Sequence, residues 1–180
     1  IGFASSAMSD LLPHDEKVID IVLTAAYAVM GRWIEEYDLW DESRAKALLT
    51  IFGVREIASQ YFGSLSEGEK KRVQISRALM ADPELLLLDE HTAALDPRMA
   101  AFVIDLTKRI IDEFDLTVMM VTHSMKDALA CGDRTVMLHQ GEIVLDVAGE
   151  QRANMQVPDL LDMFSKVRGE ELADDSLLLN

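Results

Sequence analysis

Cysteine is almost absent from this sequence, and basic residues are scarce. The 180 residues contain one cysteine, Cys131, so an internal disulfide is excluded and a reducing compartment is expected. Its simplest role is that of a small buried apolar side chain. The sequence has only 17 lysines and arginines but 32 aspartates and glutamates, which gives a net charge of -15. This surplus of negative charge repels phosphate backbones, so we expect no nucleic acid partner.

Proline, glycine and long apolar runs are also scarce. With 4 prolines, 9 glycines and 49% hydrophobic residues, the composition is typical of a globular domain. The most apolar stretch, residues 21–31, is shorter than the ~20 residues of a membrane helix, so we expect no membrane span. The N-terminus lacks the pattern of a signal peptide, and the sequence starts at Ile1 rather than at methionine, which leads us to expect a fragment.

The first half of the sequence is predicted to be mostly helical. Residues 1–4 have the pattern of a strand end, and a polar loop follows. From residue 16 apolar side chains recur at helical spacing, which predicts a long helix over 16–37. Asp41 is placed to cap a second helix that stops at Gly53.

Beyond Pro83 the pattern changes to that of buried strands. Residues 85–88 are a continuous apolar run too short for a helix, and residues 117–122 form a second run that is apolar and β-branched. A helix predicted from Pro97 separates them, and such alternation indicates a parallel sheet with crossovers. The remaining predicted elements are a hairpin turning at Gln140-Gly141, a closing helix over 157–167 and a peripheral acidic tail over 169–180.

Ser66 and Glu69 form a capping box directly before an apolar helical repeat, which predicts a helix start at Ser66. The first N–H groups of a helix lack partners within the helix and carry the positive end of its dipole, so they can receive a phosphate. Taken alone, the box indicates no more than an ordinary capped helix.

Three motifs lie in the stretch from Leu65 to Glu90, where the first continues as a helical segment to Leu79. They are Leu65-Ser66-Glu67-Gly68-Glu69, Asp82-Pro83-Glu84 and Leu85-Leu86-Leu87-Leu88-Asp89-Glu90. This stretch resembles the signature helix and metal-binding strand of ABC ATPases. The resemblance implies an α/β fold, namely a partial P-loop NTPase-like ABC ATPase domain with a mostly parallel sheet and an inserted α-helical subdomain. It also implies ATP and Mg²⁺ as cofactors.

In that family the signature helix of one subunit contacts the γ-phosphate of the ATP held by the other subunit. The resemblance implies that Ser66 and the backbone of Gly68 make this contact, with Glu69 at the last position of the motif. The family usually has two glycines here, and Glu67 replaces the first. A carboxylate close to a triphosphate is unfavourable unless it points away.

Asp89 and Glu90 are adjacent at the end of a predicted strand, so their side chains project to different sides and can serve two roles. The resemblance implies that Asp89 supports Mg²⁺ through water and that Glu90 is the general base that orients the attacking water. In isolation the pair is an ordinary polar strand exit. His91 stands where the family commonly has proline, which we expect to alter loop stiffness more than chemistry.

Two downstream motifs extend the resemblance. Ala93-Ala94-Leu95-Asp96 is similar to the D-loop, which crosses the dimer interface, and Asp96 before Pro97 is also a good helix cap. Thr122-His123-Ser124 follows the second buried strand, which predicts His123 at the same sheet edge as Glu90. A family histidine at this point contacts the γ-phosphate and the water.

The phosphate loop of such an enzyme is missing from these 180 residues, because no G-x-x-x-x-G-K-[ST] motif occurs. Residues 1–3 are similar to the strand before the family's glutamine loop, with Ser5 or Ser6 in place of the magnesium-sensing glutamine. We therefore expect the C-terminal portion of a nucleotide-binding domain, inactive alone. Its expected parts are the strand end and glutamine loop (1–9), the helical subdomain (10–80), the catalytic core (81–156) and the C-terminal helix and tail (157–180).

The leading hypothesis is the ATP-hydrolysing subunit of a bacterial ABC transporter. Such a subunit pairs with a second nucleotide-binding subunit and docks on a transmembrane permease, here through residues 10–64, at the cytoplasmic face of the cell membrane. One alternative is a soluble ABC ATPase outside transport, although the chain lacks a long coiled-coil insertion or a paired cassette. The other is a non-catalytic interaction fragment, favoured only if the natural protein begins at Ile1.

Overall fold

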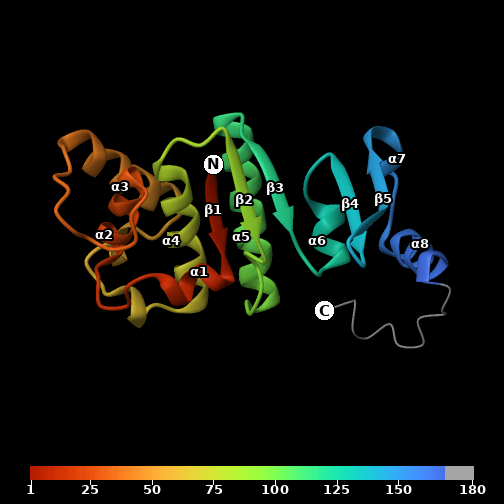
Figure 1. The fold of residues 1–180 in the computed structure, drawn as a ribbon, viewed down its shortest axis with the longest axis horizontal. Coiled ribbons are helices and arrows are strands. Elements are labelled where there is room, and N and C mark those ends of the chain that lie inside the picture. Colours follow the sequence, from red (N-terminus) through yellow and green to blue (C-terminus); the bar gives the residue numbers. More distant parts are fainter. Residues whose placement is uncertain (169–180) are drawn as a thin grey trace. The chain divides into compact units, whose positions relative to one another are not determined.

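The computed structural model describes residues 1–168, which form two compact units divided between Val121 and Thr122 (Figure 1). The first unit contains a parallel sheet with an α-helical segment before its second strand. The second unit contains an antiparallel hairpin with helices around it. The acidic tail predicted at 169–180 lies outside the described residues.

The sheet of the first unit has the order β1-β2-β3, and all three strands are parallel. The strands are β1 (Gly2–Ser5), β2 (Leu85–Asp89) and β3 (Thr117–Val121). Leu86 pairs in register with Gly2 on one side and Val118 on the other. Leu86 and Leu88 are fully buried, so β2 is the central strand that its run of leucines predicts.

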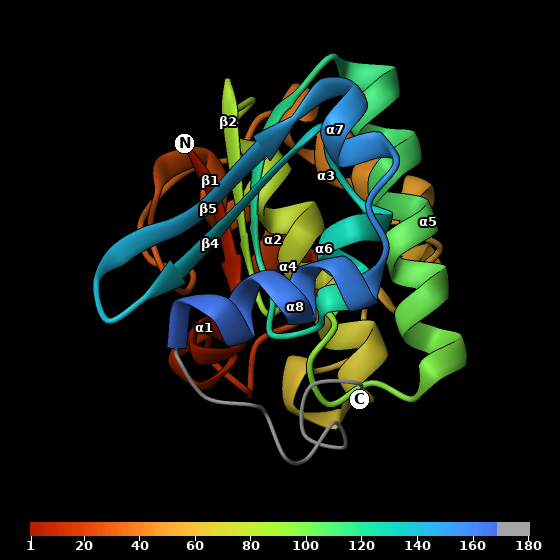
Figure 2. The same ribbon diagram turned by 90° about the vertical axis from the view of Figure 1, so that its right-hand side faces the viewer.

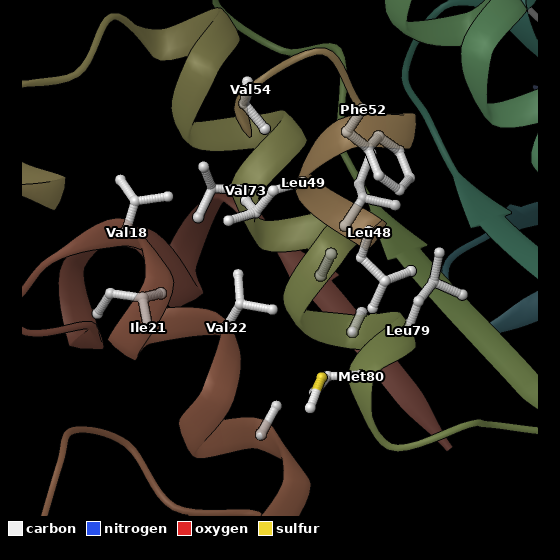
Figure 3. Close-up of a cluster of buried hydrophobic side chains, with 14 of the residues drawn as sticks. Val18, Ile21, Val22, Leu48, Leu49, Phe52, Val54, Val73, Leu79 and Met80 are labelled. Atoms are coloured by element: carbon white, nitrogen blue, oxygen red, sulfur yellow. The ribbon is translucent and has the colours of Figure 1, made fainter. Parts of the chain in front are cut away.

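The helices of the first unit share one apolar core with the sheet. They are α1 (Ser6–Leu11), α2 (Val18–Leu23), α3 (Leu39–Ile51), α4 (Glu67–Met80) and α5 (Pro97–Phe114), with 3-10 turns η1 (Thr24–Tyr27), η2 (Arg55–Ile57) and η3 (Phe62–Ser64). Figure 3 shows where α2, α3 and α4 meet, through residues such as Val22, Leu49 and Val73. The same cluster continues to Leu86 and Leu88 of β2. The strand end is therefore positioned by a core that the helical segment helps to build.

The long helix predicted over 16–37 is wrong. α2 continues directly into the 3-10 turn η1, and the helical segment ends at Ala28, whose φ is 56°. Arg77 of α4 donates to the carbonyls of Ile21 at 3.1 Å and Val29 at 2.8 Å. A side chain from a distant helix thus holds the segment in a bend that apolar spacing alone does not reveal.

The start of α3 also differs from the prediction. The N-cap is Asp38, whose carboxylate accepts from the N–H groups of Trp40 at 2.8 Å and Asp41 at 2.9 Å. Asp41 is the reciprocal member of the box and accepts from the N–H of Asp38 at 3.3 Å. The predicted stop is close, since α3 ends at Ile51 and Gly53 adopts a positive φ of 64°.

The second unit is built on the hairpin of β4 (Arg134–His139) and β5 (Glu142–Ala148), seen in Figure 2. Gln140 and Gly141 have φ of 50° and 85°, the positive values that the predicted two-residue turn requires. The helices are α6 (Met125–Ala130), α7 (Gly149–Ala153) and α8 (Val157–Arg168). Arg152 ties α7 to the end of α6 by donating to the carbonyls of Leu129 at 2.8 Å and Cys131 at 2.6 Å.

No helix within residues 1–168 has both the length and the apolar composition needed to cross a membrane.

Candidate functional site

The exit of β2 is a sharp turn at Glu90. Glu90 has φ of 48°, a left-handed conformation that residues with a side chain seldom adopt. Its N–H donates to the carbonyl of Val121 on β3 at 3.0 Å. The side chains of Asp89 and Glu90 are both partly exposed, as a role in binding or catalysis requires.

The carbonyl of Glu90 accepts hydrogen bonds from three groups. The N–H of Ala93 donates at 2.9 Å, the hydroxyl of Ser6 at 3.2 Å and the ammonium of Lys71 at 3.2 Å. Lys71 also donates to the Ser6 oxygen at 2.6 Å. The strand end is thereby tied to its own turn, to α1 and to α4.

Of the two serines considered for the glutamine-loop position, Ser6 is the one at the exit of β2. Ser5 is buried and caps α1, its hydroxyl accepting from the N–H of Met8 at 3.1 Å. The short helix that follows was predicted as loop, because six residues carry little helical periodicity.

Lys71 is a site residue that the sequence analysis did not select. Its side chain is buried, and burial lowers the pKa of its ammonium while nearby carboxylates oppose that change. Those carboxylates are Glu67, Glu90 and Asp89. The run Lys70-Lys71-Arg72 suggests a solvated surface, but helical spacing indicates that Lys71 is on the buried face. Lys71 follows Gly68 by three residues and precedes Ile75 by four, on the buried face of α4.

The start of α4 confirms Ser66 as the N-cap. The carboxylate of Glu69 accepts from the Ser66 N–H at 2.8 Å and from its hydroxyl at 2.6 Å. These two bonds, the hydroxyl one first, lower the pKa of Glu69. Glu69 therefore turns towards the helix start rather than away from it, and a phosphate bound at Ser66 would meet its negative charge.

Gly68 lies buried in the first turn of α4. A Cβ placed on it would come within 2.9 Å of Cγ of Met99 on α5. Glycine is therefore favoured here by the close approach of α5, whatever binds at the helix start. The proposed contact between its backbone and a phosphate stays a prediction.

Asp96 serves as a helix cap. Its carboxylate accepts from the N–H groups of Arg98 at 3.0 Å and Met99 at 3.1 Å, and Pro97 occupies the first turn of α5. Asp96 is also exposed, so the cap leaves open its predicted role in a D-loop at a subunit interface.

His91 is almost entirely buried, with 2% of its surface exposed. Neither ring nitrogen has a hydrogen-bond partner among the described residues. Burial, followed by the charge of Lys71, lowers its pKa to about 4. His91 is therefore a neutral packing residue at pH 7.

His123 belongs to the second unit and is exposed. The next residue, Ser124, caps α6 by accepting from the N–H of Asp127 at 3.2 Å. The predicted meeting of His123 with Glu90 stays a prediction, because the two residues are in different units.

The residues at the exit of β2 fit a magnesium ion that is held mainly by other ligands. The described residues contain no group of three or more His, Cys, Asp or Glu side chains that could cage a metal. Mg²⁺ in nucleotide sites usually binds one or two carboxylates together with water and phosphate oxygens. Asp89, a single partly exposed carboxylate, matches that donor set.

Comparisons with known proteins find one family that this chain resembles. Residues 6–93 match the family model described as ABC transporter. The tyrosine transport ATP-binding protein of Clostridioides difficile is 46% identical over 109 residues, which are 61% of this chain and 42% of that protein. The stretch 6–93 is thus similar to the ABC transporter family of ATP-binding proteins. A probable amino-acid ABC transporter ATP-binding protein of Sinorhizobium fredii is 36% identical, over 79% of this chain and 53% of its own length.

Solved structures of ABC proteins share the fold of this chain. An ABC transporter in an inward-facing conformation matches with a TM-score of 0.74 and 26% identity, over 91% of this chain and 63% of that one. An ATP-binding cassette in its ADP conformation matches with a TM-score of 0.71 at 18% identity, over 91% and 68% of the two chains. The α/β fold with a parallel sheet is thus that of ABC ATPase domains, and the chain spans about half the length of the curated relatives just named.

Proposed function

We propose that these residues are part of an ATP-hydrolysing subunit that powers solute transport through a partner permease. The observation that carries the proposal is the joint placement of two motifs in one unit. The capped start of α4 and the carboxylate exit of β2 are connected through Lys71, which bonds to the carbonyl of Glu90. Relatives named for tyrosine transport and methionine import support a transport role.

In the proposed mechanism Glu90 is the general base. Its partly exposed carboxylate at the strand end would orient a water molecule towards the γ-phosphate and accept its proton. Mg²⁺, when bound with ATP next to Asp89, would neutralise charge on the phosphates. The phosphate loop that completes such a site is not among these 180 residues.

The start of α4 would serve a different ATP molecule. Ser66 and Gly68 would contact the γ-phosphate held by a second nucleotide-binding subunit, with Asp96 at the interface between the subunits. The working unit is therefore a homo- or heterodimer, docked on a permease at the cytoplasmic face of the membrane. Each composite site would need residues from both subunits.

Replacing Glu90 by glutamine in the full-length protein encoded by this gene tests the proposal. The change keeps the shape of the side chain and removes the base, so we expect kcat to fall about 100-fold or more while ATP binding remains. Magnesium-dependent ATP hydrolysis and equilibrium nucleotide binding are the measurements. Glu113→Gln, an exposed carboxylate on α5, is the matched control. A wild-type protein without ATPase activity would contradict the function, and full turnover by Glu90→Gln would remove Glu90 from the role of base.

A further inference from the structure

The conformation of Glu90 needs support from outside its own turn. A residue other than glycine at φ 48° is in a sparsely populated region, and such residues persist where the surroundings fix them. The bond from the Ala93 N–H to the Glu90 carbonyl belongs to the turn itself. The other two donors, Ser6 and Lys71, come from α1 and α4.

Lys71 connects this support to the helix that begins at Ser66. It lies five residues beyond that N-cap, within the first turns of α4, and its buried ammonium donates to Ser6 at 2.6 Å and to the Glu90 carbonyl at 3.2 Å. Ser6 donates in turn to the same carbonyl at 3.2 Å. A displacement of α4 would therefore be transmitted to the backbone that carries the Glu90 side chain.

A buried cation is costly to place in a protein interior unless it is hydrogen-bonded. The buried face of α4 carries hydrophobic side chains such as Val73, Ile75 and Leu79 together with polar ones, among them Arg77. Lys71 lies on that face where its ammonium reaches the Glu90 carbonyl at the exit of β2. Its bonds point at the backbone of the candidate catalytic residue, which gives the lysine a role beyond filling space.

We infer that Lys71, together with Ser6, is a positioning residue that sets the orientation of Glu90 and couples it to the signature helix of the same subunit. This inference rests on the proposed function, since it assigns a purpose to Glu90 as the general base. It concerns only residues of the first unit.

Lys71→Met in the full-length protein is the test, because methionine keeps an apolar stem and loses the donors. We expect kcat to fall about 10-fold while KM for ATP changes less than about 3-fold, because misplacement of a catalytic group affects the chemical step more than binding. Amide hydrogen exchange of residues 90–93 should become faster, with α5 unchanged. Lys46→Met is the control, since Lys46 is a helical lysine that bonds to Glu42 on its own helix.

The outcomes separate the inference from the proposed function. An unchanged kcat in Lys71→Met, or faster exchange spread over the whole first unit, would overturn the positioning role and indicate a merely structural lysine. Unchanged exchange at residues 90–93 would overturn it as well. If the wild-type protein hydrolyses no ATP, the proposed function fails, and the exchange measurement alone decides whether Lys71 fixes the Glu90 backbone.

Discussion

The exit of β2 and the start of α4 are built in opposite ways. At the exit, the backbone of Glu90 is fixed by donors from three places in the chain, next to buried Leu88 and His91. At the helix start, Ser66 is exposed and its hydroxyl and N–H are both engaged by one carboxylate, that of Glu69. One region is part of the core, whereas the other is a surface feature.

This difference matches the separate roles that we propose for the two regions. A general base must be held in one orientation while its own ATP reacts, which a rigid strand exit provides. A contact to a partner's ATP must form and break as the subunits associate and separate. An exposed helix end suits this role, because a phosphate can replace the Glu69 carboxylate that accepts from Ser66. The following predictions test whether the two regions respond as differently as their construction implies.

The largest effect is expected at His91 in acid. Its pKa falls from 6.5 in the unfolded chain to about 4 in the fold, so the unfolded state binds more protons between these values. Stability is therefore fully present above pH 6.5 and is lost as the pH falls towards 4, by about 2 kcal/mol between pH 7.5 and pH 5.

Urea unfolding of wild type and His91→Leu at both pH values, without nucleotide or magnesium, measures this contribution. The variant should lose less stability in acid than wild type, whereas His14→Leu, at an exposed histidine, should behave like wild type. Parallel pH dependence in wild type and His91→Leu would show that His91 is not a buried neutral imidazole.

A smaller effect is expected at the helix start. Glu69→Gln removes a negative charge from the position where the partner's phosphate is proposed to bind, while the amide oxygen can still accept from the Ser66 N–H. The ATP concentration for half-maximal hydrolysis should fall by about 2- to 10-fold, as expected for a partly screened charge pair.

The control for this prediction is Glu67→Gln, which removes the same charge from the same helical turn but from a carboxylate paired with Lys70 at 2.8 Å. Its effect should be smaller than that of Glu69→Gln. An equal or larger effect would mean that total charge, rather than the placement of Glu69 at Ser66, controls the affinity.

Local signals predicted part of the fold correctly. The leucine run of β2, the Asp96-Pro97 start of α5 and the Gln140-Gly141 turn each carry a strong short-range preference, and the structure confirms all three. The capping box at Ser66 belongs to the same class. At the helix starts and at the hairpin turn the deciding interaction lies within a few residues of the motif, whereas in β2 the continuous apolar run itself indicates burial.

The errors arose where a distant residue decides the local structure. The helix over 16–37 fails because Arg77 holds the bend after α2, a contact across more than fifty residues. The start of α3 is a different kind of error, because Asp38 and Asp41 are both acceptable caps and lie in one reciprocal box. Lys71 resembles the case of Arg77, since its partners Ser6 and Glu90 lie far away in the sequence.

The central claim is that Glu90 and Ser66 of one chain serve two different ATP molecules, and mixed dimers of the full-length protein test it most directly. Glu90→Gln on one subunit and Ser66→Arg on the other should leave one intact composite site and measurable ATPase activity. Both substitutions on one subunit, paired with a wild-type subunit, should leave no intact site and little activity. The opposite ranking of these two dimers would contradict the account, because it would place Glu90 and Ser66 of the same chain at one ATP.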